Sequence, residues 1–142
     1  MSLKISDDFS LPVDVAGEAI GILATRGAGK SFTSAVLVEE LFDAGIQVVV
    51  LDPTGVYWGL RGASEKKGGL PLYVFGGEHG DLPLEASSGE LFADLAVEEP
   101  HSMVFDLSGF DTKSQQTRFG TQVMQRRDRH HRIEARRLER ML

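Results

Sequence analysis

Apolar residues form short runs in this chain, and glycine-containing turns separate them. Residues 20–24 and 46–51 have the length and composition of buried strands. Between them, residues 32–42 carry apolar side chains at helical spacing, and Ala44-Gly45 is a typical signal for a helix C-terminus. This order of strand, loop, helix and strand predicts a βαβ unit and therefore a parallel sheet.

The second half of the chain continues the alternation of strands and helices. Residues 72–75 and 102–107 predict two further strands, with a helix between them that Ser87 or Ser88 caps. Residues 61–69 are rich in Gly, Lys and Ser and predict a loop. From about residue 111 the chain becomes polar, and this segment is predicted to be helical as far as the C-terminus.

The turn after the first predicted strand carries the main chemical signal. Residues 24–31 match the phosphate-binding pattern G-x-x-x-x-G-K-[ST], except that Ala24 stands in place of the first glycine. An alanine fits there if its φ angle is negative. The backbone N–H groups of residues 27–31 can converge on phosphate oxygens at the positive end of the following helix. An ordinary turn with a chance Gly-Lys-Ser is the alternative, but the flanking strand and helix are the context that the motif requires.

The candidate nucleotide-binding residues occupy this loop and the first turn of the helix. We expect Lys30 to reach the β- and γ-phosphates and the Ser31 hydroxyl to ligate Mg²⁺. The Arg26 side chain could contact a phosphate or face solvent, and we favour solvent because backbone N–H groups line such loops. The predicted set is Arg26, Gly27, Ala28, Gly29, Lys30, Ser31 and Phe32.

Two aspartates end predicted strands and are candidates for a metal site. Asp52 could hold Mg²⁺ because ligands bind at the carboxyl ends of strands in open α/β sheets. An Asp before a proline also caps turns, and the residues alone favour neither role. Asp106 ends another strand and is a weaker candidate. Ser31 and Asp52 are therefore the predicted metal ligands.

The aromatic residues and histidines give weaker signals. Tyr57 and Trp58 could stack on a base, but packing against the sheet edge or against a neighbouring subunit is the favoured interpretation. The four histidines lack the spacing of metal ligands. We therefore expect no metal other than the Mg²⁺ that a nucleotide brings.

Composition restricts the class of protein further. The chain has 142 residues, of which 42% are hydrophobic and 25% charged, as expected for one globular domain. It contains no cysteine, which excludes disulfides and thiolate metal sites. No apolar run has the length of a membrane span, and the N-terminus is polar and acidic. A cytoplasmic location without membrane contact is therefore expected.

The charge of the chain is unevenly distributed. Residues 1–117 hold 7 Lys and Arg against 18 Asp and Glu, whereas residues 118–142 hold 8 Arg against 3 acidic residues. This change predicts a phosphate-binding core over 1–117 and an Arg-rich, helical segment over 118–142. The segment could bind nucleic-acid phosphates, form a solvated helix with Arg/Glu pairs, or come from an altered reading frame. We favour the solvated helix and the altered reading frame, taken together, over DNA binding.

Four segments together carry a family resemblance: ILATRGAGKSFT, VVVLDPTGVYWGLR, LYVFGGEHGDLPLE and SMVFDLSGF. They resemble the HerA/FtsK-type P-loop ATPases and, more narrowly, the HerA-like (DUF87) ATP-binding core of DNA translocases and helicases. The resemblance covers roughly residues 8–119. It implies a three-layer α/β/α P-loop core with a parallel sheet. It also implies that the chain binds ATP or ADP with Mg²⁺, and that several copies assemble into a ring, usually hexameric, that moves duplex DNA.

The chain also departs from that family. Its members have a later strand ending in Asp-Glu, in which Asp holds Mg²⁺ through water and Glu polarises the attacking water. Here Pro53 follows Asp52, and Leu107 follows Asp106. The catalytic residues therefore stay unknown, and we expect the chain to be the N-terminal part of such an ATPase. The alternative is a non-hydrolysing nucleotide-binding or interaction module; a small-molecule kinase is a weaker third.

Overall fold

The computed structural model describes residues 1–62 and 68–141, which form two compact units. The N-terminal unit consists of Met1–Val48 and Gly59–Pro71, and the sheet unit of Val49–Trp58 and Leu72–Leu142. The predicted loop over 61–69 lies largely outside the described residues.

The N-terminal unit is built around one helix and a small hairpin. Strand β1 (Ser2–Lys4) pairs antiparallel with β2 (Ser10–Pro12), and the 3₁₀-helix η1 (Val13–Gly17) follows. Helix α1 (Lys30–Asp43) packs against β1, and the Lys4 N–H donates to Glu40 Oε2 at 2.7 Å. Leu3 is fully buried in this unit.

Helix α1 ends where its sequence predicts. Ala44 is its C-cap, and Gly45 follows with a φ of 78°. The N–H groups of Gly45 and Ile46 donate to the carbonyls of Phe42 and Leu41, which satisfies the last turn of the helix. The left-handed φ at residue 45 is the conformation that glycine adopts without steric cost.

The strand predicted over 20–24 is wrong. Residues 18–25 have no regular secondary structure, and Leu23 is 95% exposed. An apolar run becomes a strand only where a neighbouring strand supplies hydrogen bonds. Among the described residues of this unit, the only strand pair is β1 with β2, so the run has no parallel partner there. These residues therefore do not form the first strand of the predicted βαβ unit.

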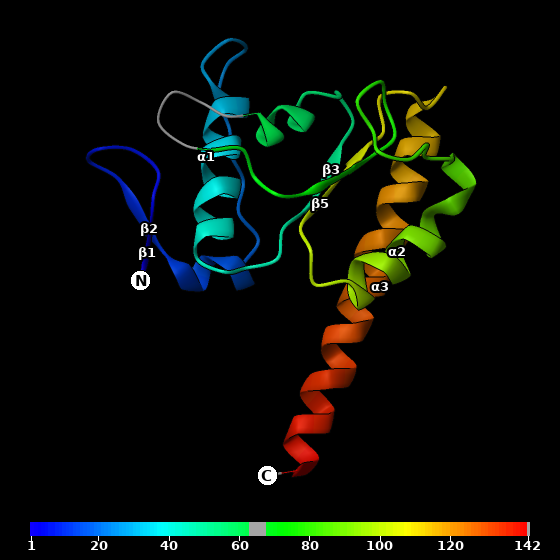
Figure 1. Cartoon of the computed structure of the whole chain (residues 1–142). Helices are drawn as coiled ribbons and strands as arrows, with labels where there is room; N and C mark the ends of the chain where they lie inside the picture. The colour runs from blue at the N-terminus through cyan, green and yellow to red at the C-terminus, as the bar shows by residue number, and fades with distance from the viewer. Residues whose placement is uncertain (63–67, 142) are drawn as a thin grey trace. The chain divides into compact units, whose positions relative to one another are not determined.

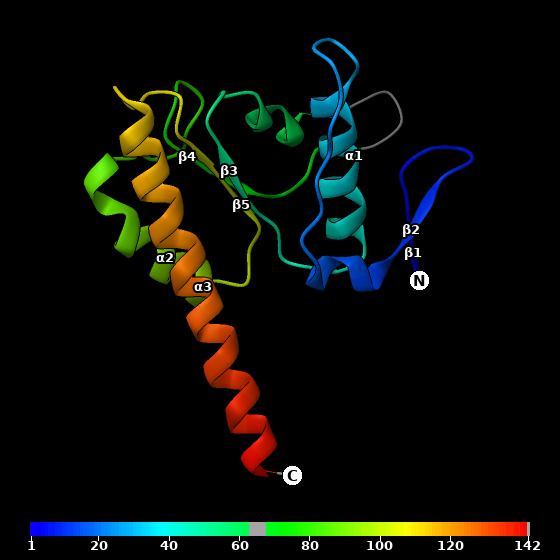
Figure 2. The same ribbon diagram turned by 180° about the vertical axis from the view of Figure 1, so that it is seen from behind.

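The sheet unit contains a parallel three-stranded sheet (Figures 1 and 2). Strands β3 (Val49–Asp52), β4 (Tyr73–Phe75) and β5 (Met103–Asp106) are arranged in the order β3-β5-β4. In register, Val104 of β5 lies between Val50 and Val74, and Asp106 lies beside Asp52. The fold is thus α/β with a parallel sheet, which confirms the predicted fold class.

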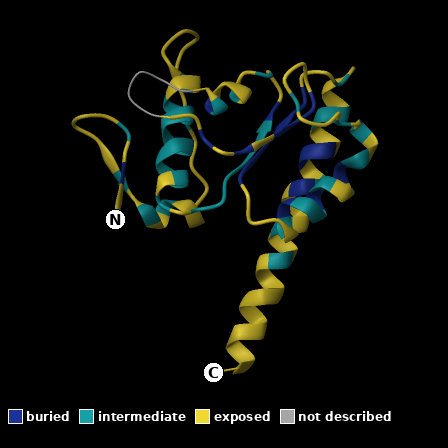
Figure 3. Ribbon diagram, in the orientation of Figure 1, coloured by how far each residue is buried: buried dark blue, intermediate teal, exposed yellow. Residues whose placement is uncertain are grey.

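Helices α2 (Gly89–Glu98) and α3 (Lys113–Met141) flank this sheet and pack on each other. Two short 3₁₀-helices, η2 (Tyr57–Arg61) and η3 (Ala86–Ser88), complete the described elements. Aromatic rings fill the core: Phe105 lies 5.7 Å from Phe75 and 5.6 Å from Phe119 between ring centroids. Ala93 and Ala96 of α2 are fully buried and let the two helices approach closely. The buried residues of this unit follow the sheet and the first turns of α3 (Figure 3).

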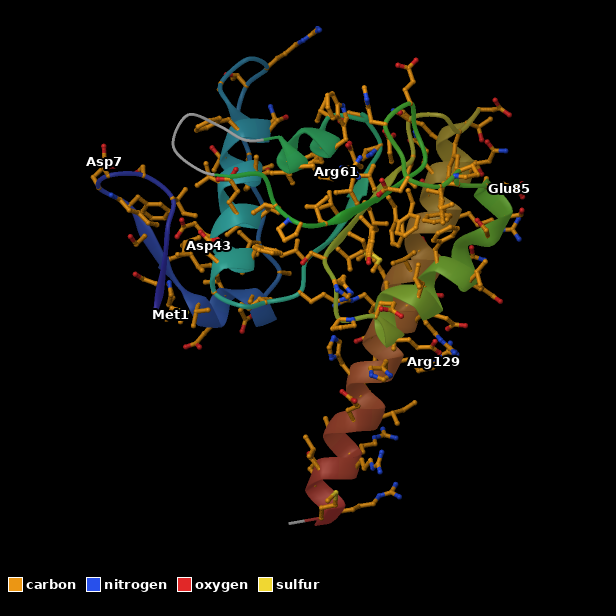
Figure 4. All side chains as sticks on the ribbon, in the orientation of Figure 1. Met1, Asp7, Asp43, Arg61, Glu85 and Arg129 are labelled. Carbon is orange, nitrogen blue, oxygen red and sulfur yellow. The ribbon has the colours of Figure 1, made fainter. Side chains whose placement is uncertain are left out.

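The Arg-rich segment continues α3 without a break. Phe119, Gly120 and Val123 are buried, whereas residues 131–141 are exposed, and their side chains project from the helix beyond Arg129 (Figure 4). Arg126 pairs with Asp94 at 2.6 Å, and Arg127 Nη1 donates to the Ala96 carbonyl at 3.2 Å. The boundary expected at 118 falls inside this helix, and its functional meaning stays a prediction.

Candidate functional site

The glycine loop before α1 has the conformation that its sequence requires. Gly27 and Gly29 have φ angles of 81° and 93°, in the left-handed region that side chains disfavour. The space in which a Cβ would lie is open at both positions. The backbone conformation therefore requires glycine at both positions. No atom of the described residues fills the space where their Cβ atoms would lie.

The start of α1 offers unpaired N–H donors. Gly29 is the N-cap and has no side chain, and the first helical hydrogen bond runs from the Thr33 N–H to the Gly29 carbonyl at 2.9 Å. The N–H groups of residues 30–32 precede that bond, so no helical carbonyl accepts from them. The first turn contains no acidic side chain that would offset the positive end of the helix. Residues 19–38 hold two cations, Arg26 and Lys30, and no Asp or Glu, which favours an anion.

The Lys30 side chain folds back over the loop. Its ammonium group donates to the carbonyl oxygens of Ala24 at 2.9 Å and Thr25 at 3.2 Å. These contacts hold the cation beside the open glycines. A phosphate oxygen could replace a carbonyl as its acceptor, because a charged acceptor makes the stronger hydrogen bond.

The other predicted loop residues are exposed. Ser31 and Phe32 lie in the first turn of α1, and Phe32 is 75% exposed. Neither the Ser31 hydroxyl nor the Arg26 guanidinium has a hydrogen-bond partner among the described residues, so Arg26 faces solvent here. Their roles toward a nucleotide stay predictions.

Ala24 is compatible with the loop because no described residue other than glycine has a positive φ. We expect Ala24→Gly to leave Mg-ATP affinity unchanged and to cost about 0.5–1 kcal/mol of stability through the entropy of the unfolded chain. Calorimetric titration and thermal unfolding measure the two effects. Gly29→Ala is the opposite control, since a Cβ at its φ of 93° costs about 1–2 kcal/mol. A large gain in affinity for Ala24→Gly would show that Ala24 strains the loop.

Asp52 lies in the sheet unit, whereas the glycine loop lies in the N-terminal unit. Its carboxylate is fully buried and accepts five hydrogen bonds. Oδ1 accepts from the Thr54 N–H, the Thr54 hydroxyl and the Gly55 N–H at 2.8–2.9 Å; Oδ2 accepts from the N–H groups of Val56 and Tyr57, both at 2.8 Å. Asp52 therefore caps the turn after β3, and its contact with Mg²⁺ stays a prediction.

Asp106 lies beside Asp52 in the sheet but in different surroundings. It is 4% exposed, and its Oδ1 accepts from the Ser108 N–H at 2.9 Å and hydroxyl at 2.6 Å. It borders a cavity of about 480 Å³ within the sheet unit. Sequence reasoning gave this residue little weight; the Gly76-Gly77 pair after β4 was the available signal, because it marks a close backbone approach.

Trp58 is occupied by an intramolecular contact. Its ring stacks on His79, with ring centroids 3.7 Å apart and an interplanar angle of 23°. This contact agrees with packing of Trp58 within the protein, and not with a ring face left open for stacking on a base. Within the described residues, no group of three His, Asp or Glu side chains is placed to hold a metal ion.

The fold and the loop first define a class: an α/β protein with a parallel sheet and a glycine loop before a helix. Within that class, residues 5–76 match the family described as Helicase HerA, central domain, and the chain belongs to this family. No curated protein and no solved structure matches the chain. None of the described helices is long and apolar enough to cross a membrane.

Proposed function

We propose that this chain binds ATP and ADP with Mg²⁺ through residues 27–31 and is the ATP-binding part of a HerA-like DNA-translocating ATPase. The observation that supports it best is the loop itself, in which two left-handed glycines precede a helix start with free N–H donors and Lys30 folds over the loop. The match over residues 5–76 supports the family, and the DNA substrate comes from the family description as a helicase.

The residues present fit a nucleotide phosphate group. Backbone N–H groups of residues 30–32 would face the phosphate oxygens, with Lys30 beside the terminal phosphates and the Ser31 hydroxyl toward Mg²⁺. The Ala28 N–H already donates to the Thr25 carbonyl at 3.2 Å. The metal ion would neutralise phosphate charge. Asp52 orders the turn after β3 in this proposal, and a contact with Mg²⁺ is a further role that its variants test.

Assembly, location and the alternative function are also proposals. A ring of several copies moving duplex DNA in the cytoplasm follows from the resemblance to HerA/FtsK-type motors. A non-hydrolysing nucleotide-binding module is the second candidate, and one observation favours it: Pro53 and Leu107 follow the two strand-end aspartates where a Glu would be needed to orient water.

The test of nucleotide binding is calorimetric titration with Mg-ATP of the full chain beside Lys30→Ala. We expect the variant to bind at least about tenfold more weakly, because a hydrogen bond to a charged group contributes about 1.5–3 kcal/mol. Lys113→Ala removes an exposed lysine at the start of α3 and serves as the matched control. Equal affinity of the wild type and Lys30→Ala would remove the phosphate-loop assignment.

A further inference from the structure

A glycine-lined cavity opens at the carboxyl ends of the three parallel strands. It has a volume of about 480 Å³, and residues following β3, β4 and β5 line it, among them Gly55, Gly77 and Ser108. In open α/β sheets, ligands bind in the crevice at this end of the strands. All of its lining residues belong to the sheet unit.

A buried carboxylate with an unused oxygen forms part of the cavity wall. Asp106 is 96% buried, and both of its hydrogen bonds, from Ser108, end on Oδ1. Oδ2 lies against Gly77 and has no hydrogen bond from any residue that the structure describes. Asp52, its neighbour in register, has both oxygens saturated. Asp106 lines the cavity, so Oδ2 is an acceptor that a bound donor could use.

Glycines let the loops after β3 and β4 approach Ser108 and Asp106 closely. Gly55 and Gly77 have φ angles of 73° and 64°. A Cβ at Gly55 would lie 2.6 Å from the Ser108 hydroxyl, and one at Gly77 would overlap the Asp106 carboxylate. The loop after β4 is held in place, since the Gly76 N–H donates to the Leu82 carbonyl at 2.8 Å. The cavity is thus a formed feature of the backbone.

The charge of the cavity selects the class of ligand. Its ionisable residues are Asp106, Glu78 and His79, and no Lys or Arg is among its described lining residues. A phosphate would meet like charge there, which disfavours it. Three metal-ligating side chains do not converge in the described part of the chain, so a metal ion is also disfavoured.

We propose that this cavity binds a cationic N–H donor, an ammonium or guanidinium group, with Asp106 Oδ2 as its acceptor. Such a group would form a charge-assisted hydrogen bond in a partly dehydrated site. It comes either from a lysine or arginine side chain of a protein partner or from a free small amine. This inference does not rest on nucleotide binding by the loop at 24–31.

The experiment is a titration of the ¹⁵N-labelled full chain, followed by the amide signals of Gly55, Gly77 and Gly109. The probes are N-acetyl-arginine amide and N-acetyl-lysine amide for partner side chains, agmatine for a free amine, and N-acetyl-citrulline amide as the uncharged control. We expect a cationic probe to shift these signals and to bind about tenfold or more tightly than the citrulline probe. Tighter binding of a capped side chain than of agmatine assigns the site to a protein partner, and the reverse order assigns it to a free amine.

Two variants connect the binding to Asp106. Asp106→Asn keeps the shape of the side chain and should lose the preference for the cation, whereas Asp111→Asn removes an exposed carboxylate outside the cavity and should change nothing. If Asp106→Asn does not fold, the contrast between arginine and citrulline in the wild type decides alone. Equal binding of those two probes, no shift at any probe concentration up to tens of millimolar, or unchanged binding in a folded Asp106→Asn would each overturn the proposal.

Discussion

Asp52→Ala is expected to lower the free energy of unfolding by about 3–5 kcal/mol, because it removes five hydrogen bonds to one buried carboxylate. The carboxylate is fully buried and accepts five hydrogen bonds from residues 54–57. Alanine removes the common acceptor of these part-buried donors, and each lost hydrogen bond to a charged group contributes to the loss of stability. The turn after β3 should therefore lose its fixed conformation, and the sheet its central pairing with β5.

Denaturant unfolding of the wild type, Asp52→Ala and Asp111→Ala measures this loss. Asp111 is exposed, and its replacement should change the stability by less than about 0.5 kcal/mol. Asp52→Asn separates the cap from the metal role, because its amide keeps one acceptor oxygen but loses the charge. A variant of normal stability that binds Mg-ATP much more weakly would identify Asp52 as a metal ligand instead of a cap.

Hydrophobic spacing predicted the elements whose partners lie within one unit. Helix α1 ends at the Ala44-Gly45 signal, since a left-handed glycine after the last turn is a local requirement of the backbone. Strands β4 and β5 fall inside the predicted runs, and Ser88 occupies the N-cap position of α2. The Ser88 hydroxyl nevertheless donates to the Glu85 carbonyl at 2.6 Å and does not cap the helix. The preference of serine for the N-cap position therefore located the start of α2, but it did not predict which hydrogen bonds Ser88 makes.

The errors arose where structure depends on partners distant in the sequence. Residues 20–24 are as apolar as a strand, yet pairing decides whether a run becomes one, and sequence spacing says nothing about pairing. Of the run at 46–51, only residues 49–51 belong to a strand, β3, because its neighbour β5 begins in register with Val49.

The candidate sites divide in the same way. The loop at 24–31 is a local motif, so its glycine conformations follow from the sequence. The two roles weighed for Asp52 could not be separated, because the cap depends on where five donors converge. The cavity at Asp106 joins residues after three strands, and only the register brings Gly55, Gly77 and Ser108 together. In a single sequence, the glycines are the main signal of such a site.

The chain alone is expected to bind nucleotide and to hydrolyse it very slowly. Phosphoryl transfer to water requires held phosphates, a placed metal, an oriented water and stabilisation of the developing charge. The loop and Ser31 are proposed to supply the first two. No Glu follows Asp52 or Asp106, and both oxygens of Asp52 already accept hydrogen bonds from the following turn. Asp52 is therefore not expected to orient the attacking water, and no Glu beside Asp106 is available for that role.

Stabilising the developing charge would also require a cation in addition to Lys30. An arginine finger contributes ~10³–10⁵ to the rate and is supplied either by the same chain or by a partner. Arg126 and Arg127 are held by Asp94 and the Ala96 carbonyl, and Arg132 pairs with Asp128. The arginines beyond residue 132 are exposed on α3. Steady-state phosphate release by the purified chain, with and without duplex DNA, measures the turnover, and Lys30→Ala gives the background. We expect the wild type to stay close to that background under both conditions. DNA-stimulated release far above Lys30→Ala would mean that Asp52, Asp106 or the arginines of α3 complete a catalytic centre.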